Sequence, residues 1–472
     1  MPLIRVVFLL SFVSALQAAK FSLPIIVNKL PANSEFVVVH TAIDFTELLR
    51  AENEAAPVDE RSLRLFEIRG DKRTEIPYQF TAAAQPRPRA RPLLPGTPST
   101  VSYAAEYAAT NAPGNIKGAG EISWIIQNPG AGHASFVLEF STAAAGRIVQ
   151  TPFPPEDFRM FDESGRATPV RWFPSLQLHP QWPLDGIIHF SENQKLITSY
   201  HLGPATNSAS AQLRRPFLYP VNGPDDIPLT EFGKPHDPTG SHAHHYSLWI
   251  AHNSVDGIDF WSERGGIIAH ESLDEMEDGP IFSRLVQKAR WRHEARDILR
   301  ETRTITVYKS VENFRALDIG LALTPAASNN VTFGKTSFGF LAARVAQSMT
   351  VFDGAGEIRT SAGKLNESGA HLTHANWLDQ SGPIAQDKWG GIAMLDSPDN
   401  ANFPSGWHCR NDGWAGAAFN MDAPYVLDAG KTLRLRYRLI LHRGDAAKAN
   451  IDRRFEEWAA RPEIKLGAVN KL

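Results

Sequence analysis

Short runs of β-branched and aromatic residues, separated by turn residues, recur along the chain and most constrain its fold. They include "EFVVVH", "SLRLFEI", "EISWII", "SFVLEF", "TITVYKS", "RALDIGLALT" and "LRLRYRLILH". With 34 Gly and 33 Pro, this spacing is typical of antiparallel β architecture rather than of alternating strands and helices. Helical periodicity is best at the end of the chain, where Ile451, Phe455 and Trp458 share one helix face. We therefore expect an all-β protein with a short C-terminal helix that caps the last sheet.

The length of 472 residues is too great for a single core and suggests two to three domains. Proline and tryptophan alternate in "RWFPSLQLHPQWPLDG" (171–186), which we interpret as the domain boundary. The segment "AAAQPRPRARPLLPGTPST" (82–100) cannot be a central strand, because proline lacks the backbone N–H that a sheet requires. The sequence thus predicts an N-terminal β-sandwich over 20–180 with an insertion at 82–100, and a second β-sandwich over 186–472.

Residues 1–19 resemble a bacterial export signal. Arg5 precedes the apolar run Val6 to Val13, and small residues follow up to Ala19. The run is shorter than the roughly 20 apolar residues that a membrane span needs. We expect an exported protein, periplasmic or extracellular, with no membrane span.

Charge and cysteine content exclude other classes. A formal net charge of -3 provides no general attraction to nucleic acid, so no nucleic-acid partner is expected. The one cysteine, Cys409, allows no intramolecular disulfide and no cysteine-rich zinc site. Phosphate-loop, dinucleotide-binding, G-x-S-x-G and H-E-x-x-H motifs are missing from the sequence, which argues against the enzyme classes that depend on them.

The stretch "SHAHHYSLWIAHNSVDGIDFW" (241–261) is dense in histidine, acid and tryptophan. An extended backbone would place His242, His244 and His252 on one side, and His245 and Trp249 on the other. A helix would instead bring His242, His245, Trp249 and His252 together. The extended geometry fits the strand-rich surroundings better.

Three roles for these histidines remain open. His242 and His244 could bind a divalent metal ion if a third ligand, such as His270, His408 or Glu301, came from elsewhere. The imidazoles could instead perform acid/base chemistry near neutral pH or contact a substrate. The structural alternative is that some of these rings hydrogen-bond to backbone carbonyls or lie in a loop.

Aromatic side chains in the same stretch suit a sugar ligand. Trp249 and Trp261 could stack on sugar C–H faces, with Asp259 among the polar partners, and core packing is the alternative for each indole. A second dense stretch, "GWHCRNDGW", sets Trp407, His408 and Arg410 close together after a turn-rich loop. Arg410 could hold an anionic group through two hydrogen bonds or pair with the neighbouring Asp412.

Five ordered motifs resemble the bacterial PmoA-like family, which carries the label methane oxygenase PmoA. They fall on Arg215–Phe217, His244–Trp249, Asn366–Gly369, Asp396–Asn400 and Trp407–Arg410, and the resemblance runs from about Gly186 to the C-terminus. Tyr246 and Ser247 stand where the family usually has Arg and Gly, which puts the substrate specificity in doubt. The resemblance implies an exported β-sandwich protein associated with polysaccharide-processing genes. Copper oxygenase chemistry does not transfer from the label, because a membrane methane monooxygenase subunit is built of membrane-spanning helices.

Together these observations lead us to expect a large C-terminal sandwich of the kind found in sugar mutarotases and polysaccharide lyases. The expected function is that of an exported carbohydrate-active protein that hydrolyses or eliminates a glycoside linkage. The alternatives are a glycan-binding or scaffold protein without activity, and the metal-dependent oxidoreductase that the family label suggests. One divalent metal ion is the cofactor that this interpretation allows. The expected site residues are His244, His245, His252 and Arg410 for catalysis, Arg215, Trp249, Asp259, Trp261, Asn400, Trp407 and His408 for substrate binding, and His242 with His244 for metal.

Overall fold

The computed structural model describes residues 18–82, 115–116, 118–129, 132–142, 159–161, 167–169, 175–178, 186–193, 195–204, 213–233, 242–262, 264–277 and 279–472. Nearly all of the predicted export signal and of the Pro/Arg-rich insertion lie outside these residues. Most of the predicted domain boundary at 171–186 also lies outside them.

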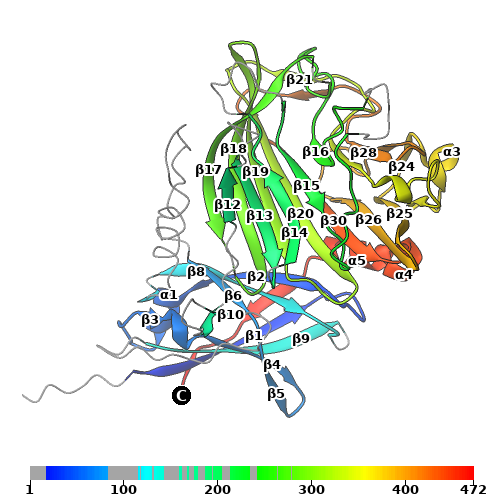
Figure 1. Ribbon diagram of the computed structural model, residues 1–472. Helices are drawn as coiled ribbons and strands as arrows, with labels where there is room; N and C mark the ends of the chain where they lie inside the picture. Colours follow the sequence, from blue (N-terminus) through cyan, green and yellow to red (C-terminus); the bar gives the residue numbers. More distant parts are fainter. Residues whose placement is uncertain are drawn as a thin grey trace, which may run out of the picture.

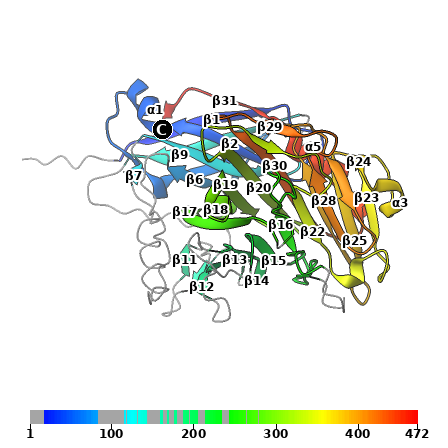
Figure 2. The ribbon, with the colours of Figure 1, turned by 90° about the horizontal axis from the view of Figure 1, so that it is seen from above.

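Two large antiparallel sheets dominate the described part of the chain, one of nine strands (sheet I) and one of eight (sheet II). Figures 1 and 2 show them as neighbouring layers. In spatial order, sheet I contains β12 (Ser175–Leu178), β13 (Gly186–Glu192), β14 (Lys195–His201), β15 (Phe217–Val221), β16 (Leu248–Ile250), β22 (Leu341–Arg344), β28 (Trp414–Ala418), β27 (Gly406–Cys409) and β24 (Thr373–His374). Sheet II contains β17 (Ile267–Glu277), β18 (Phe282–His293), β19 (Arg296–Tyr308), β20 (Phe314–Pro325), β30 (Leu433–Arg443), β26 (Lys388–Asp396), β25 (Trp377–Ala385) and β23 (Glu357–Thr360).

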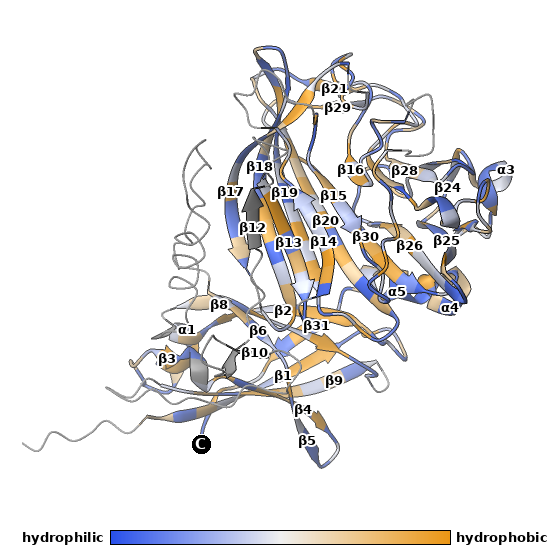
Figure 3. Ribbon diagram, in the orientation of Figure 1, coloured by the Kyte–Doolittle hydropathy of each residue, from blue (hydrophilic) through white to orange (hydrophobic). Residues whose placement is uncertain are grey.

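Alternation along the strands builds the core between these two sheets. Successive side chains of a strand point to opposite faces, so every second residue is buried between the sheets. In β16, Leu248 and Ile250 join this core, while Trp249 belongs to a separate cluster on the other face of sheet I. Figure 3 shows the same pattern as hydrophobic and hydrophilic positions along the strands. Each sheet therefore also has an outer face, on which polar and aromatic side chains can meet a ligand.

Two further sheets form the N-terminal β-sandwich. In the residues that the structure covers, sheet III contains β31 (Glu463–Leu466), β1 (Lys20–Asn28), β9 (His133–Ser141), β4 (Arg64–Arg69) and β5 (Lys72–Ile76), with β32 (Asn470–Lys471) also paired to β1. Sheet IV contains β2 (Val37–Asp44), β8 (Ala119–Ile126) and β6 (Gln79–Ala82). A hydrophobic cluster that includes Leu23, Val39, Trp124 and Phe136 fills the space between them. The predicted all-β fold with two β-sandwiches is confirmed.

The last strands of the chain return to the N-terminal sandwich. Residue Leu466 of β31 pairs with Ile25 of β1, and Lys471 of β32 pairs with Phe21. Figure 1 shows this red segment running back into the blue and cyan strands. The N-terminal sandwich therefore contains residues from both ends of the sequence, which the predicted assignment of 186–472 to one domain did not anticipate.

The predicted C-terminal helix is present as α5 (Ile451–Ala459). Ile451 and Trp458 of this helix are buried in a cluster with Phe36 of the N-terminal sandwich and Phe314 of β20. Alternation along β2 and β8 turns Val38 and Ile125 towards the same cluster. The helix and the N-terminal sandwich thus cover one end of the outer face of sheet II, and among the described residues Arg434 and Arg436 are exposed at the other end.

The remaining elements are short. They are the strand pairs β3 (Val58–Asp59) with β7 (Asn115–Ile116), β10 (Arg159–Phe161) with β11 (Ala167–Pro169), and β21 (Val331–Phe333) with β29 (Tyr425–Leu427), and the helices α1 (Phe45–Ala51), α3 (Asn366–Ala370) and α4 (Ala446–Ala449).

Candidate functional site

A cross-strand row on the outer face of sheet I defines the candidate site. Phe217 pairs with Trp249, Trp249 with Ala342, Ala342 with Gly416, and Gly416 with His408. Directly opposed residues on neighbouring strands lie on the same face of a sheet. The two small residues in the middle of the row therefore lie between the indole on one side and the imidazole on the other. We call the surface formed by His242, His244, His245, Trp249, Trp261, Phe338, His371, His408 and Trp414 the His–Trp face.

The indole of Trp414 joins the two segments that the sequence singled out. Its ring lies 5.4 Å from that of His245 and 5.4 Å from that of Trp261, measured between centroids. On its other side it stacks on His408 at 4.1 Å. Phe338 lies 5.9 Å from Trp414 and is 38% exposed, so the cluster reaches the surface there. The histidine-rich segment thus meets His408 of β27 and Trp414 of β28 on one face.

A turn, rather than a strand, gathers the histidines. The backbone N–H of His245 donates to the carbonyl of His242, and Ser247 adopts a φ of 61°, which lies in the left-handed region. Regular extension begins only at Leu248. As a result the rings of His242 and His244 both lie against His245, with centroids 5.0 and 4.5 Å away. The prediction that His245 would face away from His242 and His244 was wrong for this reason.

The imidazole of His245 is neutral and hydrogen-bonded. It is 2% exposed, and its Nδ1 lies 3.0 Å from Nη1 of Arg344. Because a guanidinium only donates, Nδ1 must accept, which leaves the ring proton on Nε2. Burial first, and then the neighbouring His244 and Arg344, holds the pKa of His245 well below its ordinary value. His245 is therefore suited to donate a hydrogen bond, and less suited to act as a base.

His242 lies beside a carboxylate. Its Nε2 is 3.7 Å from Oδ2 of Asp412, and the same oxygen is 3.5 Å from Nη2 of Arg344. The side chain of His242 is 28% exposed, and that of His244 is half-buried. A carboxylate next to an imidazole orients the ring, as in many acid/base sites. His242 and His244 are therefore the imidazoles of this turn that a substrate can reach.

The other end of the face contains a second imidazole pair. The rings of His371 and His408 meet edge to face at 4.5 Å. Burial, the neighbouring His371 and the nearby Arg410 lower the pKa of His408 to about 3. Arg410 itself is half exposed and pairs with Glu367, from Nε to Oε1 at 2.9 Å. The alternative partner considered from sequence, Asp412, bonds instead to the arginine of β22.

Two predicted binding residues hold the surrounding loops in place. Arg215 is fully buried, and its two terminal nitrogens donate to the carbonyls of His244 at 3.0 Å and Trp261 at 2.6 Å. The carboxylate of Asp259 accepts from the backbone N–H groups of Trp261 and Ser262. Arg215 and Asp259 therefore hold the backbone that carries His244 and Trp261 in position.

Two other predicted residues, His252 and Trp407, lie away from the face. His252 is fully buried between Phe333 and Phe340 and shares a hydrogen bond with Asn420, and burial lowers its pKa to about 4. Trp407 points into the core, because it alternates with His408 along β27. Neither side chain is accessible to a sugar in this structure.

Asn400 has a structural role on a different surface. Its amide donates to the carboxylate of Asp396 and to the carbonyl of Arg436, while its own oxygen accepts from the N–H of Arg436. Asp396 also accepts from the backbone of Ser405, and burial raises its pKa to about 6. The Asp396–Asn400 motif is thus a turn anchored to β30 of sheet II.

The described residues contain no group of three or more His, Cys, Asp or Glu side chains arranged to hold a metal ion. Two of the third ligands considered for His242 and His244 are engaged elsewhere. His270 bonds to Gln287, and Glu301 to Trp291 and Arg303. His408 lies on the same face, with its Nδ1 at 3.2 Å from the hydroxyl of Ser337.

Sequence reasoning missed three residues of the face, Phe338, His371 and Trp414, and also Arg344, which contacts His245. One signal was available for Arg344. An arginine within the small apolar run "FLAARVA" must be buried, and a buried guanidinium needs partners such as His245 and Asp412.

A family model matches residues 188–456, which is more than half of the chain and includes the whole His–Trp face. The chain belongs to the family of unknown function DUF6807. The resemblance to the PmoA-like family was therefore wrong, because the model that matches is that of a different family. No curated protein matches the chain.

Several solved structures resemble the DUF6807 protein at low similarity. One is a protein in glycosyl hydrolase family 38 from Enterococcus faecalis, with a TM-score of 0.40 and 9% identity over 95% of this chain and 47% of that chain. Another is a heparinase III, with a TM-score of 0.28 and 9% identity over 66% of this chain and 43% of that chain. The DUF6807 chain thus spans less than half of the length of either protein. Likeness at this level says nothing about what it binds.

Among the residues that the structure places, no helix has the length and apolar character needed to cross a membrane.

Proposed function

We propose that this DUF6807 protein is an exported carbohydrate-active protein that hydrolyses or eliminates a glycoside linkage at the His–Trp face. The observation that carries the proposal is the convergence, at Trp414, of the two segments rich in imidazole and indole side chains. Neither segment alone offers more than an aromatic strand or a polar loop.

Aromatic rings supply the binding surface in this proposal. Phe338 is 38% exposed and lies 5.9 Å from Trp261 and 4.9 Å from His408, between centroids. Rings of this kind stack on the C–H faces of sugars.

Proton transfer falls to the imidazoles. Among the described residues, the carboxylates beside the face are Asp412 and Glu367, which pair with Arg344 and Arg410 respectively. An ordinary imidazole titrates near neutral pH and can serve as acid or base without further tuning. We assign this role to His242, which lies beside Asp412, and to His244. His245 and His408, which burial keeps neutral, would hold the neighbouring rings of the face in position.

A glycan-binding protein without catalytic activity is the second candidate. It is favoured by the low pKa values of His245 and His408, since two imidazoles that remain neutral throughout the physiological range suit recognition better than proton transfer. The two candidates differ in one observable, the formation of product.

The test is an assay of the purified protein against neutral and uronate-containing oligosaccharides. A new reducing end reports hydrolysis, and a new absorbing double bond reports elimination. We expect His242→Ala and His244→Ala each to lower kcat by about 10²–10⁴-fold, the usual contribution of a general acid or base. His293→Ala is the matched control, because His293 is a partly exposed histidine at the end of β18, on the other sheet.

Unchanged turnover in both site variants would remove the imidazoles from the mechanism. Binding without any product would establish the second candidate. Release of the mature chain outside the cytoplasm, with residues 1–19 removed, tests the proposed export.

A further inference from the structure

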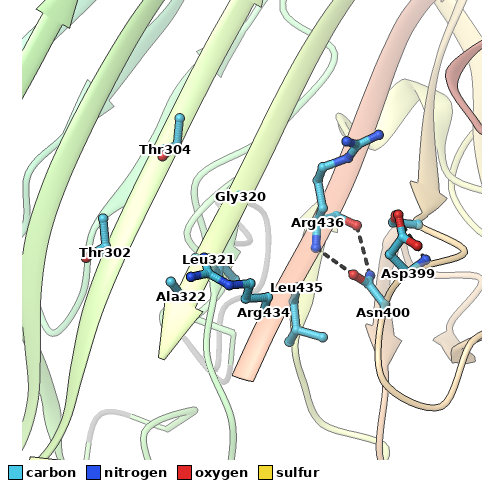
Figure 4. A pocket seen from close by; sticks show the side chains of 11 residues that line it. Thr302, Thr304, Gly320, Leu321, Ala322, Asp399, Asn400, Arg434, Leu435 and Arg436 are labelled. Atoms are coloured by element: carbon cyan, nitrogen blue, oxygen red, sulfur yellow. Dashed lines mark hydrogen bonds between the residues drawn. The ribbon is translucent and has the colours of Figure 1, made fainter. Parts of the chain in front are cut away.

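A groove crosses the open end of the outer face of sheet II, on the opposite side of the sandwich from the His–Trp face. Its volume is about 320 Å³. The lining residues come from β19, β20, β30 and the Asp396–Asn400 turn, and include Thr302, Thr304, Gly320, Ala322, Arg434 and Arg436. Figure 4 shows the side chains of these residues around the groove.

Two parallel cross-strand rows build this groove. In one row Thr304 pairs with Gly320, and Gly320 with Arg436. In the next, Thr302 pairs with Ala322, and Ala322 with Arg434. Each row therefore runs from a hydroxyl through a small residue to a guanidinium. The small residues form the floor along β20, and the hydrogen-bonding groups form the two sides.

The arginines of this groove lack acidic partners. Within the described residues, neither Arg434 nor Arg436 forms an ion pair, and both side chains are exposed. Other arginines on the same face are paired: Arg290 bonds to Glu271 and Asp297, and Arg438 bonds to Asp318 through both carboxylate oxygens. Asp399, the carboxylate that lines the groove, pairs with Arg461. The groove thus carries two positive charges that the described residues do not neutralise.

Neighbouring contacts hold Arg436 in position. Its backbone exchanges two hydrogen bonds with Asn400, at 2.7 and 2.8 Å, which Figure 4 shows as dashed lines. Its guanidinium lies over the indole of Trp458, 4.7 Å from the ring centroid. A guanidinium fixed in this way binds an anion with little further loss of conformational freedom. Arg434, two residues along the same face of β30, is the second contact point.

We propose that this groove is a second binding site, which takes an anionic group carried on a sugar, either a carboxylate or a sulfate. Guanidinium groups bind both anions through paired hydrogen bonds, and the threonine hydroxyls opposite suit the hydroxyls of the same ligand. The assignment of the ligand as a sugar rests on the proposed function, whereas the assignment of its charge rests on the groove alone.

Isothermal titration with three oligosaccharides of equal length tests the proposal: one uronate-containing, one sulfated and one neutral. Binding of the uronate or the sulfated ligand identifies the anion, and we expect the neutral ligand to bind the groove at least tenfold more weakly. The double variant R434Q/R436Q is expected to lower the anionic affinity at least tenfold. K72Q is the control for loss of a positive charge outside the groove, because Lys72 is an exposed cation on β5 of the N-terminal sandwich.

A second variant tests the shape of the groove without changing charge. A Cβ atom at position 320 would meet only the Cβ of Thr304, at 3.8 Å, so the backbone has room for the Cβ of Gly320→Thr, which adds a branched side chain to the floor. We expect it to reduce anionic binding at least tenfold with an unchanged thermal unfolding midpoint.

Equal affinity of R434Q/R436Q and K72Q for the anionic ligand would contradict the proposal that the groove is an anion-binding site. Equal binding of the neutral and anionic ligands would also contradict it. The proposed function fails separately. Unchanged turnover in His244→Ala, together with lost anion binding in R434Q/R436Q, would contradict catalysis at the His–Trp face and still support the groove as an anion-binding site.

Discussion

The imidazole of His408 stacks on the indole of Trp414, with ring centroids 4.1 Å apart and planes inclined by 30°. The same indole contacts His245 from the other segment at 5.4 Å. His245 and His408, more than 150 positions apart in the sequence, therefore contact one aromatic side chain. Any ligand that contacts Phe338 or the exposed histidines is positioned by packing from both.

Replacement of Trp414 should separate binding from folding. Trp414→Ala removes a side chain that is 5% exposed and is expected to cost about 3–5 kcal/mol of unfolding free energy. Trp414→Phe retains a ring and should cost less, yet weaken glycan binding, because the smaller ring cannot contact His245 and His408 together. Urea denaturation and titration of the same samples measure the two effects. Glycan affinity in Trp414→Phe equal to that of the wild type would show that the shared indole has no role in binding.

Arg215 should be irreplaceable even by lysine. Its guanidinium bonds two carbonyls from different loops, whereas a lysine ammonium is a single point charge. Arg215→Lys is expected to lower the unfolding free energy by about 1–3 kcal/mol, the cost of a buried carbonyl left without a donor. Arg214→Lys is the matched control, since Arg214 donates through one nitrogen to one carbonyl of the described residues, that of Gly265. Equal losses in the two variants would contradict the bridging role.

The low pKa of His408 predicts an acid-sensitive fold. The pKa is about 3 in the folded protein and 6.5 in an ordinary imidazole, so between these pH values the unfolded chain binds a proton that the folded chain does not. Stability contributed by the neutral ring is present above pH 6.5 and is lost as the pH falls. Relative to His408→Asn, the wild type should lose about 1.4 kcal/mol per pH unit between pH 6 and 4. Chemical denaturation at several pH values measures this difference, and a difference independent of pH would refute the assignment.

The stability of the fold should depend on both members of the buried ion pair Glu301–Arg303. Nε of Arg303 lies 2.5 Å from Oε1 of Glu301, whose other oxygen accepts from the indole of Trp291 at 2.6 Å. Glu301→Ala leaves a guanidinium buried without its counter-ion and should cost about 3–5 kcal/mol of unfolding free energy. The apolar double variant E301L/R303M should cost less than either single change, because it buries no charge. A double variant as unstable as the sum of the two single ones would contradict this.

Much of the fold could be predicted from periodicity alone. Strand alternation accounts for Leu248 and Ile250 in the core and Trp249 on the outer face, and the spacing of Ile451 and Trp458 correctly places a helix. Both signals are local, since side-chain direction follows directly from backbone conformation.

Other features depend on backbone conformation or on distant partners. Residues 242–245 form a turn and Ser247 is left-handed, so the extended backbone begins only at Leu248 and the faces predicted for His242 to His245 were wrong. Side chains alternate along β27, so Trp407 points into the core although its neighbour His408 reaches the face. The pairing of the last strands with β1 joins residues more than 400 positions apart, and no local pattern encodes such a contact.

A crystal structure with a bound oligosaccharide tests the shared site most directly. The ring of one sugar should lie against Phe338, with a linkage oxygen or ring hydrogen within hydrogen-bond reach of His242 or His244. A sugar that contacts only one of the two segments, or binds nowhere on the outer face of sheet I, would contradict a common site.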